Sequence, residues 1–218
     1  MKQTAKLILT AATASVMLAG CLPAIVGGAA VGTKSVVDRR SSGAQADDNV
    51  MAVRVAQSAR SYLRQNNPTI GYKPKISVVS YNRNLLLLGQ VSNESEKQAV
   101  EQIARNERAA ANVYNYITVS PDARTFDNVA TDSWGTSKVR TALLGLPAST
   151  QARVKIVTYG NVTYVMGILT PTEQAAVTQR VSTTIGVQKV VTLYQEYNGI
   201  NGSASAPAAP VSPAAAQP

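Results

Sequence analysis

Few side chains in this sequence are able to do chemistry. Its 218 residues include no histidine and one cysteine, Cys21. Without histidine there is no Ser-His-Asp triad, Cys-His pair or histidine metal site, and a single cysteine excludes an intrachain disulfide and a thiolate zinc cluster. A glycine-rich phosphate loop is absent as well. We therefore predict a protein without catalytic residues, metal ligands or cofactors, and not an enzyme.

Helix ends account for the carboxylates better than acid–base catalysis does. Glu94, Glu96 and Glu101 lie around one predicted helix, and its positive N-terminal end favours acidic side chains in the first turn. Asp132 is expected to cap the N-terminus of a later helix.

The residues around Cys21 predict covalent lipid attachment. Lys2 and Lys6 precede an apolar stretch, residues 7–19, that is too short to span a bilayer. Its last two residues begin the tetrapeptide Leu18-Ala19-Gly20-Cys21. This order resembles the lipobox of bacterial lipoproteins, whose cysteine receives a diacylglycerol and, after cleavage, an acyl chain on its amine. We expect a signal peptide over residues 1–20 and a permanent anchor on Cys21. The alternative is an ordinary secretory peptide in which Cys21 is incidental.

Residue 22 is Leu rather than Asp. In the lipoproteins that the chain resembles, Asp after the cysteine favours the inner membrane, so Leu22 indicates the outer membrane, with the chain facing the periplasm. Residues 22–32 are apolar and Gly-rich and either form a pliant tether or lie against the bilayer, and Ser, Gly, Ala and charged residues over 33–47 predict a linker. We therefore expect the lipidated N-terminus and linker over residues 21–47. The tail, residues 198–218, is rich in Ala and Pro and is predicted to be disordered.

An internal repeat determines the domain organisation. Gly89 and Gly167 end similar Val- and Leu-rich segments at an offset of 78 residues (167 − 89), and Glu96 and Glu173 follow at an offset of 77. The repeat predicts two tandem modules, residues 48–120 and 128–197.

Each module reads as helix, strand, strand, helix, strand. The predicted helices cover 50–63 and 95–106 in the first module and 132–146 and 171–184 in the second, and short polar turns between the first two strands suit hairpins. The αββαβ order predicts an α+β fold in which a small sheet is covered on one face by two helices. Modules of about 70 residues bury modest cores, so contact between the two copies is a candidate source of stability.

The strand endings carry a family resemblance. Leu88-Gly89-Gln90-Val91 and Met166-Gly167-Ile168-Leu169, with Gly186-Val187 before the last strand, resemble the BON domain. Two such modules behind a lipobox resemble the dual-BON-domain outer-membrane lipoproteins, although Ala109-Ala110-Ala111 replaces Gly-Val in the first copy. The resemblance implies binding of phospholipid or a membrane surface in the periplasm and maintenance of outer-membrane integrity, without catalysis.

The first helix of the second module has two apolar faces. At 100° per residue, Val139 and Leu143 lie on the core stripe, and Trp134, Thr141 and Leu144 lie on the far side. Lys138 and Arg140 lie on opposite flanks, a pattern expected of insertion at an anionic headgroup surface. The equivalent helix of the first module is basic without an aromatic anchor. The family resemblance also implies that this helix of the second module contacts anionic phospholipid. We therefore predict five lipid-binding residues: Trp134, Lys138, Arg140, Thr141 and Leu144.

Other interpretations of these residues remain. Trp134 could pack on the other module or on the linker around Phe126, and Lys138 and Arg140 could belong to an ordinary solvated face. The net charge of +9 requires an anionic partner. An anionic phospholipid membrane is the leading hypothesis. A protein-interaction adaptor for an envelope assembly machine or for cell-wall hydrolase regulation is the alternative, whereas a nucleic-acid partner conflicts with export.

Overall fold

The computed structural model describes residues 38–67, 74–120 and 124–198, all within one compact unit, residues 35–218. The predicted signal peptide, Cys21 and nearly all of the predicted tail lie outside these residues.

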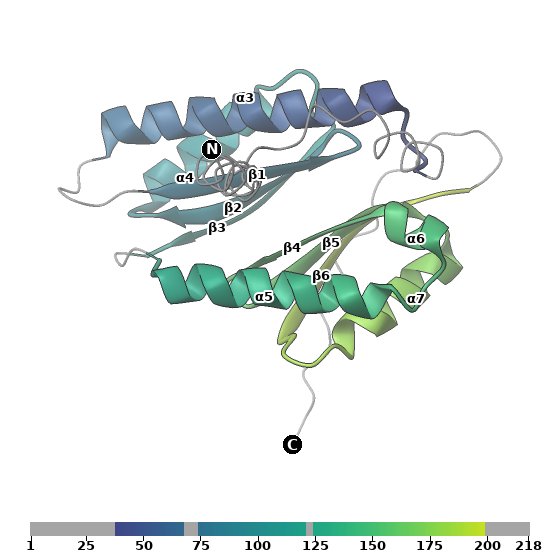
Figure 1. Ribbon diagram of the computed structural model, residues 1–218. Helices are drawn as coiled ribbons and strands as arrows, with labels where there is room; N and C mark the ends of the chain where they lie inside the picture. Colours follow the sequence, from purple (N-terminus) through teal and green to yellow (C-terminus); the bar gives the residue numbers. More distant parts are fainter. Residues whose placement is uncertain (1–37, 68–73, 121–123, 199–218) are drawn as a thin grey trace, which may run out of the picture. The chain divides into compact units, whose positions relative to one another are not determined.

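The first module has its two helices on one face of a three-stranded sheet (Figure 1). In the sheet, β1 pairs antiparallel with β2, and β2 pairs parallel with β3 across the α4 connection. Apolar side chains of both helices and of the sheet form a buried core between them. The elements in chain order are α3 (Ser42–Asn66), β1 (Lys75–Tyr81), β2 (Asn84–Val91), α4 (Glu94–Arg105) and β3 (Asn112–Val119).

The second module repeats this order with one short additional helix, α6. Its sheet has the same pairing, and α5 and α7 lie on one face of it over a second buried core (Figure 1). The predicted α+β fold, with two helices on one face of each sheet, agrees with the structure. The elements are α5 (Phe126–Leu143), α6 (Ala148–Ala152), β4 (Val154–Tyr159), β5 (Val162–Leu169), α7 (Pro171–Ser182) and β6 (Lys189–Glu196).

The helix-free faces of the two sheets contribute to a third, shared core. Leu86 and Leu88 of β2 are buried in one cluster with Tyr164 and Met166 of β5. The Tyr116 and Tyr164 rings meet edge to face with centroids 4.9 Å apart. Such aromatic pairs add roughly 0.5–1.5 kcal/mol beyond the burial of area. The expected contact between the two copies is therefore present, and it buries the second face of each sheet.

Polar contacts also join the two modules. The Tyr81 hydroxyl donates to the Arg153 carbonyl oxygen at 2.7 Å, and Lys155 Nζ donates to the Ser80 carbonyl oxygen at 2.9 Å. Burial, together with the nearby Arg40 charge, lowers the pKa of Lys155. The carbonyl of Ser80 compensates in part for the cost of placing this ammonium group between the modules.

The N-terminal part of the described chain differs from the expected linker. Helix α3 begins at Ser42 because the Ser41 side chain caps it, so residues 42–47 are helical. Just before it, Arg39 donates to the Ile168 carbonyl oxygen at 2.6 Å and pairs with Glu173 at 2.7 Å. Residues 38–47 are thus tied to the modules, and the predicted boundary at residue 48 falls inside a helix.

A buried aspartate holds the hairpin turn of each module. Asp48 accepts from the backbone N–H groups of Asn82 at 2.6 Å and Arg83 at 2.8 Å, and pairs with Arg40 at 2.8 Å. The second module has the same arrangement. Asp132 accepts from the turn N–H groups of Gly160 and Asn161 and pairs with Arg124. In both modules the arginine precedes the aspartate by eight residues.

The prediction that Asp132 caps a helix is wrong. Helix α5 begins earlier, at Phe126, where Thr125 and Asn128 form a capping box. Asp132 lies in the second turn of that helix, and its carboxylate accepts from the turn between β4 and β5 instead. The predicted module boundary at residue 128 therefore also falls within a helix.

Candidate functional site

Helix α5 is held against the sheet by one buried stripe and by polar contacts to β4 and to the β4–β5 turn. Val139 and Leu143 are buried in the core of the second module. The Thr136 hydroxyl accepts from the Thr158 backbone N–H at 2.9 Å, which occupies a donor on edge strand β4. These contacts fix the rotation of α5, and therefore which side chains point outward.

The outward side of α5 carries large apolar side chains. Trp134 is 65% exposed, Leu144 is 68% exposed, and Phe126 is also exposed. The alternative in which Trp134 packs on the other module or near Phe126 thus does not describe this structure. The Lys138 ammonium lies 5.7 Å from the centre of the indole ring, within the range of a cation–π contact.

Trp134, Lys138 and Thr141 line one side of a surface pocket of about 530 Å³. Its other side comes from the C-terminal end of α7 and the turn that follows. Arg180 and Ile185 are the notable side chains there, and neither was predicted from the sequence. No local pattern could have indicated them, because more than 40 residues separate Arg180 from Trp134.

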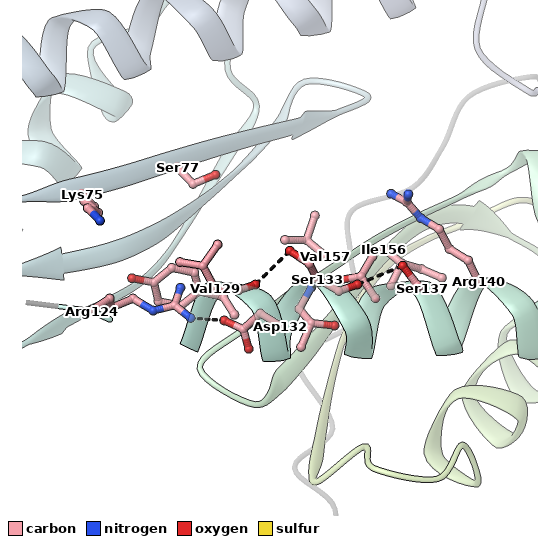
Figure 2. Close-up of a pocket in the computed structure, with 13 residues that line it drawn as sticks. Lys75, Ser77, Arg124, Val129, Asp132, Ser133, Ser137, Arg140, Ile156 and Val157 are labelled. Atoms are coloured by element: carbon pink, nitrogen blue, oxygen red, sulfur yellow. Dashed lines mark hydrogen bonds and ion pairs between the residues drawn. The ribbon is translucent and has the colours of Figure 1, made fainter. Parts of the chain in front are cut away.

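Arg140 points to a different pocket. This second pocket, of about 520 Å³, lies on the opposite flank of α5 beside β4 and is also lined by Lys75 of β1 (Figure 2). Figure 2 shows Arg124 and Asp132 paired near one end of it and Arg140 near the other. The predicted set is therefore split: Trp134, Lys138 and Thr141 share one pocket, Arg140 lines the other, and Leu144 lines neither.

The cations around the first pocket have no acidic partner in the described part of the chain. Among the described residues, no ion pair involves Lys138 or Arg180, whereas Arg124 is paired with Asp132 and stacks over the Tyr159 ring at 4.0 Å. Burial raises the pKa of Tyr159, and the Arg124 charge opposes that rise. Tyr159 thus stays a neutral phenol near neutral pH, and the basic side chains within α5 itself are Lys138 and Arg140.

Within residues 38–67, 74–120 and 124–198, no group of three His, Cys, Asp or Glu side chains could hold a metal ion. No helix in those ranges is long and apolar enough to cross a membrane.

Comparisons with known proteins found a family model that matches the first module and relatives that cover most of the chain. The BON domain family model matches residues 53–121. The outer membrane lipoprotein DolP of Haemophilus influenzae is 29% identical over 182 residues, covering 84% of this chain and 91% of that protein. The 21 kDa hemolysin of Actinobacillus pleuropneumoniae is 28% identical, covering 71% of this chain and 77% of that protein.

Solved structures offer a weaker likeness. CdsD, a structural protein of the type III secretion system of Chlamydia trachomatis, matches with a TM-score of 0.26 and 11% identity over 65% of this chain and 93% of that one. The family match covers most of the first module, and the relatives extend across the chain. The chain therefore contains a BON domain over residues 53–121, is similar to the outer membrane lipoprotein DolP along most of its length, and belongs to the outer membrane.

Proposed function

We propose that this protein is anchored to the outer membrane by lipid on Cys21, faces the periplasm, and binds anionic phospholipid through helix α5 of the second module. By doing so it supports the integrity of the envelope. Two tandem BON modules, the second over residues 124–197, form the binding unit. The relationship to an outer membrane lipoprotein supports the location.

One observation carries the binding proposal: the sole tryptophan is exposed beside a lysine that has no acidic partner among the described residues. Indole rings favour the headgroup level of a bilayer, and each Lys or Arg near an anionic surface adds roughly 1 kcal/mol. Exposed apolar groups that cost free energy in water become favourable when a membrane covers them.

Vesicle binding tests this function. The soluble chain from residue 22 onward, which keeps every described residue, is mixed with phosphatidylglycerol or phosphatidylcholine vesicles and sedimented. We expect salt-sensitive binding to the anionic vesicles only, a blue shift of Trp134 fluorescence, and at least tenfold weaker binding by Trp134→Ala.

The matched control is Tyr62→Ala on the outer side of α3, which should bind within twofold of wild type. Equal binding by Trp134→Ala and wild type would reject the site. Absence of any binding to phosphatidylglycerol would reject the function.

A second candidate is a protein-interaction adaptor for envelope assembly or cell-wall hydrolase regulation. The pocket that Arg140 and Lys75 line favours it, because that pocket is cationic and rich in hydroxyl groups and faces away from Trp134. Photo-crosslinking from Ser77 in the envelope should then capture a protein that Arg140→Glu no longer captures. Loss of vesicle binding without loss of this crosslink would separate the two functions.

A further inference from the structure

The turn after α7 exposes an isoleucine in an ordered position. Ile185 is 88% exposed, the highest fraction among the large apolar side chains of the described chain. The turn is held by backbone bonds from Thr184 N to the Val181 oxygen and from Val187 N to the Thr184 oxygen, both 3.1 Å. Because these bonds fix the backbone, the isoleucine cannot fold back on the core without breaking them.

Two glycines bring this turn and α5 close together. A Cβ on Gly186, whose φ is +92°, would lie 3.1 Å from Lys138 Nζ, and a Cβ on Gly145 would lie 2.9 Å from an Arg180 guanidinium nitrogen. Lys138 therefore lies against the turn after α7, and Arg180 lies against the residue that follows the C-cap of α5. Lys138 and Arg180 end up in the same pocket as Trp134 and Ile185.

The first module shows what normally faces such a cation. The offset that relates Asp48 to Asp132 is 84 residues (132 − 48), and the same offset relates Arg54 to Lys138 (138 − 54). Arg54 pairs at 2.9 Å with Glu107, which lies in the turn after α4. The corresponding turn of the second module, residues 183–188, contains no acidic residue. In the described part of the chain, the cation is thus paired with an acid in the first module and has no acidic partner in the second.

We propose that the turn around Ile185 is a second membrane-contacting element of the protein. Ile185 inserts into an anionic bilayer beside Trp134, and a lipid phosphate lies between Lys138 and Arg180, in the place that Glu107 holds in the first module. Two apolar groups with two cations between them match a bilayer surface, which presents acyl chains beneath a layer of phosphates. This inference rests on the proposed function, in which α5 faces anionic lipid.

A probe at residue 185 tests insertion directly. The soluble chain from residue 22 lacks cysteine, so Ile185→Cys can be labelled with an environment-sensitive nitrobenzoxadiazole dye, with Val53→Cys on α3 as the matched control. On phosphatidylglycerol vesicles we expect a blue-shifted dye at 185 that lipid-soluble quenchers reach, and an unchanged dye at 53. Trp134 fluorescence of the unlabelled protein is recorded in parallel.

The two readouts separate the two proposals. If the fluorescence of Trp134 shifts to the blue while the emission of the dye at residue 185 remains that of a dye in water, the inference about the turn is wrong and the proposed function stands. If neither signal changes on phosphatidylglycerol, the proposed function is wrong and the inference falls with it.

Charge variants test the phosphate position. Ile185→Glu offers Lys138 the internal carboxylate that Glu107 offers Arg54, and it should weaken binding to phosphatidylglycerol vesicles at least tenfold. Ile185→Gln, which removes only the apolar group, should weaken it about threefold. Arg180→Gln should weaken binding to these vesicles about fivefold, and Arg64→Gln on α3 should weaken it less than twofold.

Each variant is first compared with wild type by urea unfolding, which confirms that it folds. Equal vesicle binding by Ile185→Glu and Ile185→Gln would overturn the phosphate position. Wild-type binding by Ile185→Glu would overturn the whole inference.

Discussion

Helices α3 and α5 are copies of one element with different outer faces. Both have an aspartate that holds the adjacent hairpin turn and an arginine eight residues earlier that pairs with it. On α3 the outer cations have partners within the module: Arg54 pairs with Glu107, and Arg60 donates to the Ile76 carbonyl oxygen at 2.9 Å. In the described chain, Lys138 of α5 has no acidic partner, and a tryptophan stands beside it.

The difference shows that the number of charges does not determine which module binds anions. Residues 48–120 contain nine basic and five acidic side chains, and residues 128–197 contain six and three, so the net charges are almost equal. What differs is whether a cation is already neutralised by the protein. A cation with an internal carboxylate gains little from an external anion, whereas one without a partner gains the full interaction.

The largest effect should come from removing the aspartate that both helices share. Asp48→Ala leaves Arg40 without one of its carboxylates and frees a turn in which Asn82 and Arg83 have φ of 48° and 64°. Because buried pairs are costly to break, we expect a loss of about 3–5 kcal/mol in the free energy of unfolding, measured in urea. Asp132→Ala should cost less, because its turn begins with Gly160, which adopts positive φ without strain.

The neighbouring Asp47 is exposed and serves as the control for Asp48. Asp47→Ala should change the free energy of unfolding by less than about 0.5 kcal/mol. Equal effects at positions 47 and 48 would show that the carboxylate does not hold the turn.

Glu173 and its counterpart in the first module, Glu96, provide the next comparison. Glu173 forms ion pairs with Arg39 at 2.7 Å and Arg153 at 2.9 Å. Glu96 instead accepts hydrogen bonds from the neutral donors of Ser92 and Asn67. Glu173→Gln should cost about 1–3 kcal/mol at pH 7, and Glu96→Gln should cost less.

The effect of Glu173 should depend on pH. Burial acts to raise the pKa of Glu173, but the Thr170 N–H, the hydrogen bond from Arg39 and the charges of both arginines outweigh it and lower the pKa below the ordinary 4.5. A lowered folded-state pKa stabilises the protein above 4.5, and this contribution is lost as the pH falls through the folded value. The gap between wild type and Glu173→Gln in urea unfolding should therefore shrink at pH 3; a constant gap would contradict this.

An aromatic anchor and an unpaired cation, as α5 has among the described residues, can be introduced into α3 by substitution. Val50 lies at the position that corresponds to Trp134. In a Trp134→Ala background, Val50→Trp with Glu107→Gln should restore several-fold binding to phosphatidylglycerol vesicles, since it adds an aromatic anchor and frees Arg54. Val50→Trp alone should restore less, because Glu107 still neutralises Arg54. Equal restoration by both would show that the ion pair is irrelevant.

The smallest effect should come from Arg54 itself. Its side chain is largely exposed, and exposed ion pairs contribute at most about 1 kcal/mol. Arg54→Gln should therefore lower the free energy of unfolding by less than that amount and leave vesicle binding unchanged. A fivefold loss of binding, the effect expected of Arg180→Gln, would place lipid on the first module as well.

The order of helices and strands could be read from the sequence because it depends on local patterns. Alternating and continuous apolar runs marked all six strands, and Thr170-Pro171 with Glu173 marked the start of α7, where a capping box is present. The starts of α3 and α5 were placed too late. The first six residues of α5, 126–131, are all exposed, so no apolar period distinguishes them from a linker.

The sequence by itself determined that Trp134 and Lys138 share one side of α5 and that Arg140 lies on the other flank, because side chains repeat every 100° along a helix. Only the tertiary structure brought Arg180 and Ile185 to that side, and only it showed that Glu107 neutralises Arg54 while the equivalent turn offers Lys138 no acid. Helical periodicity fixes the direction of a side chain. Whether that side chain already has a partner depends on segments far away in the sequence, which meet it only when the chain has folded.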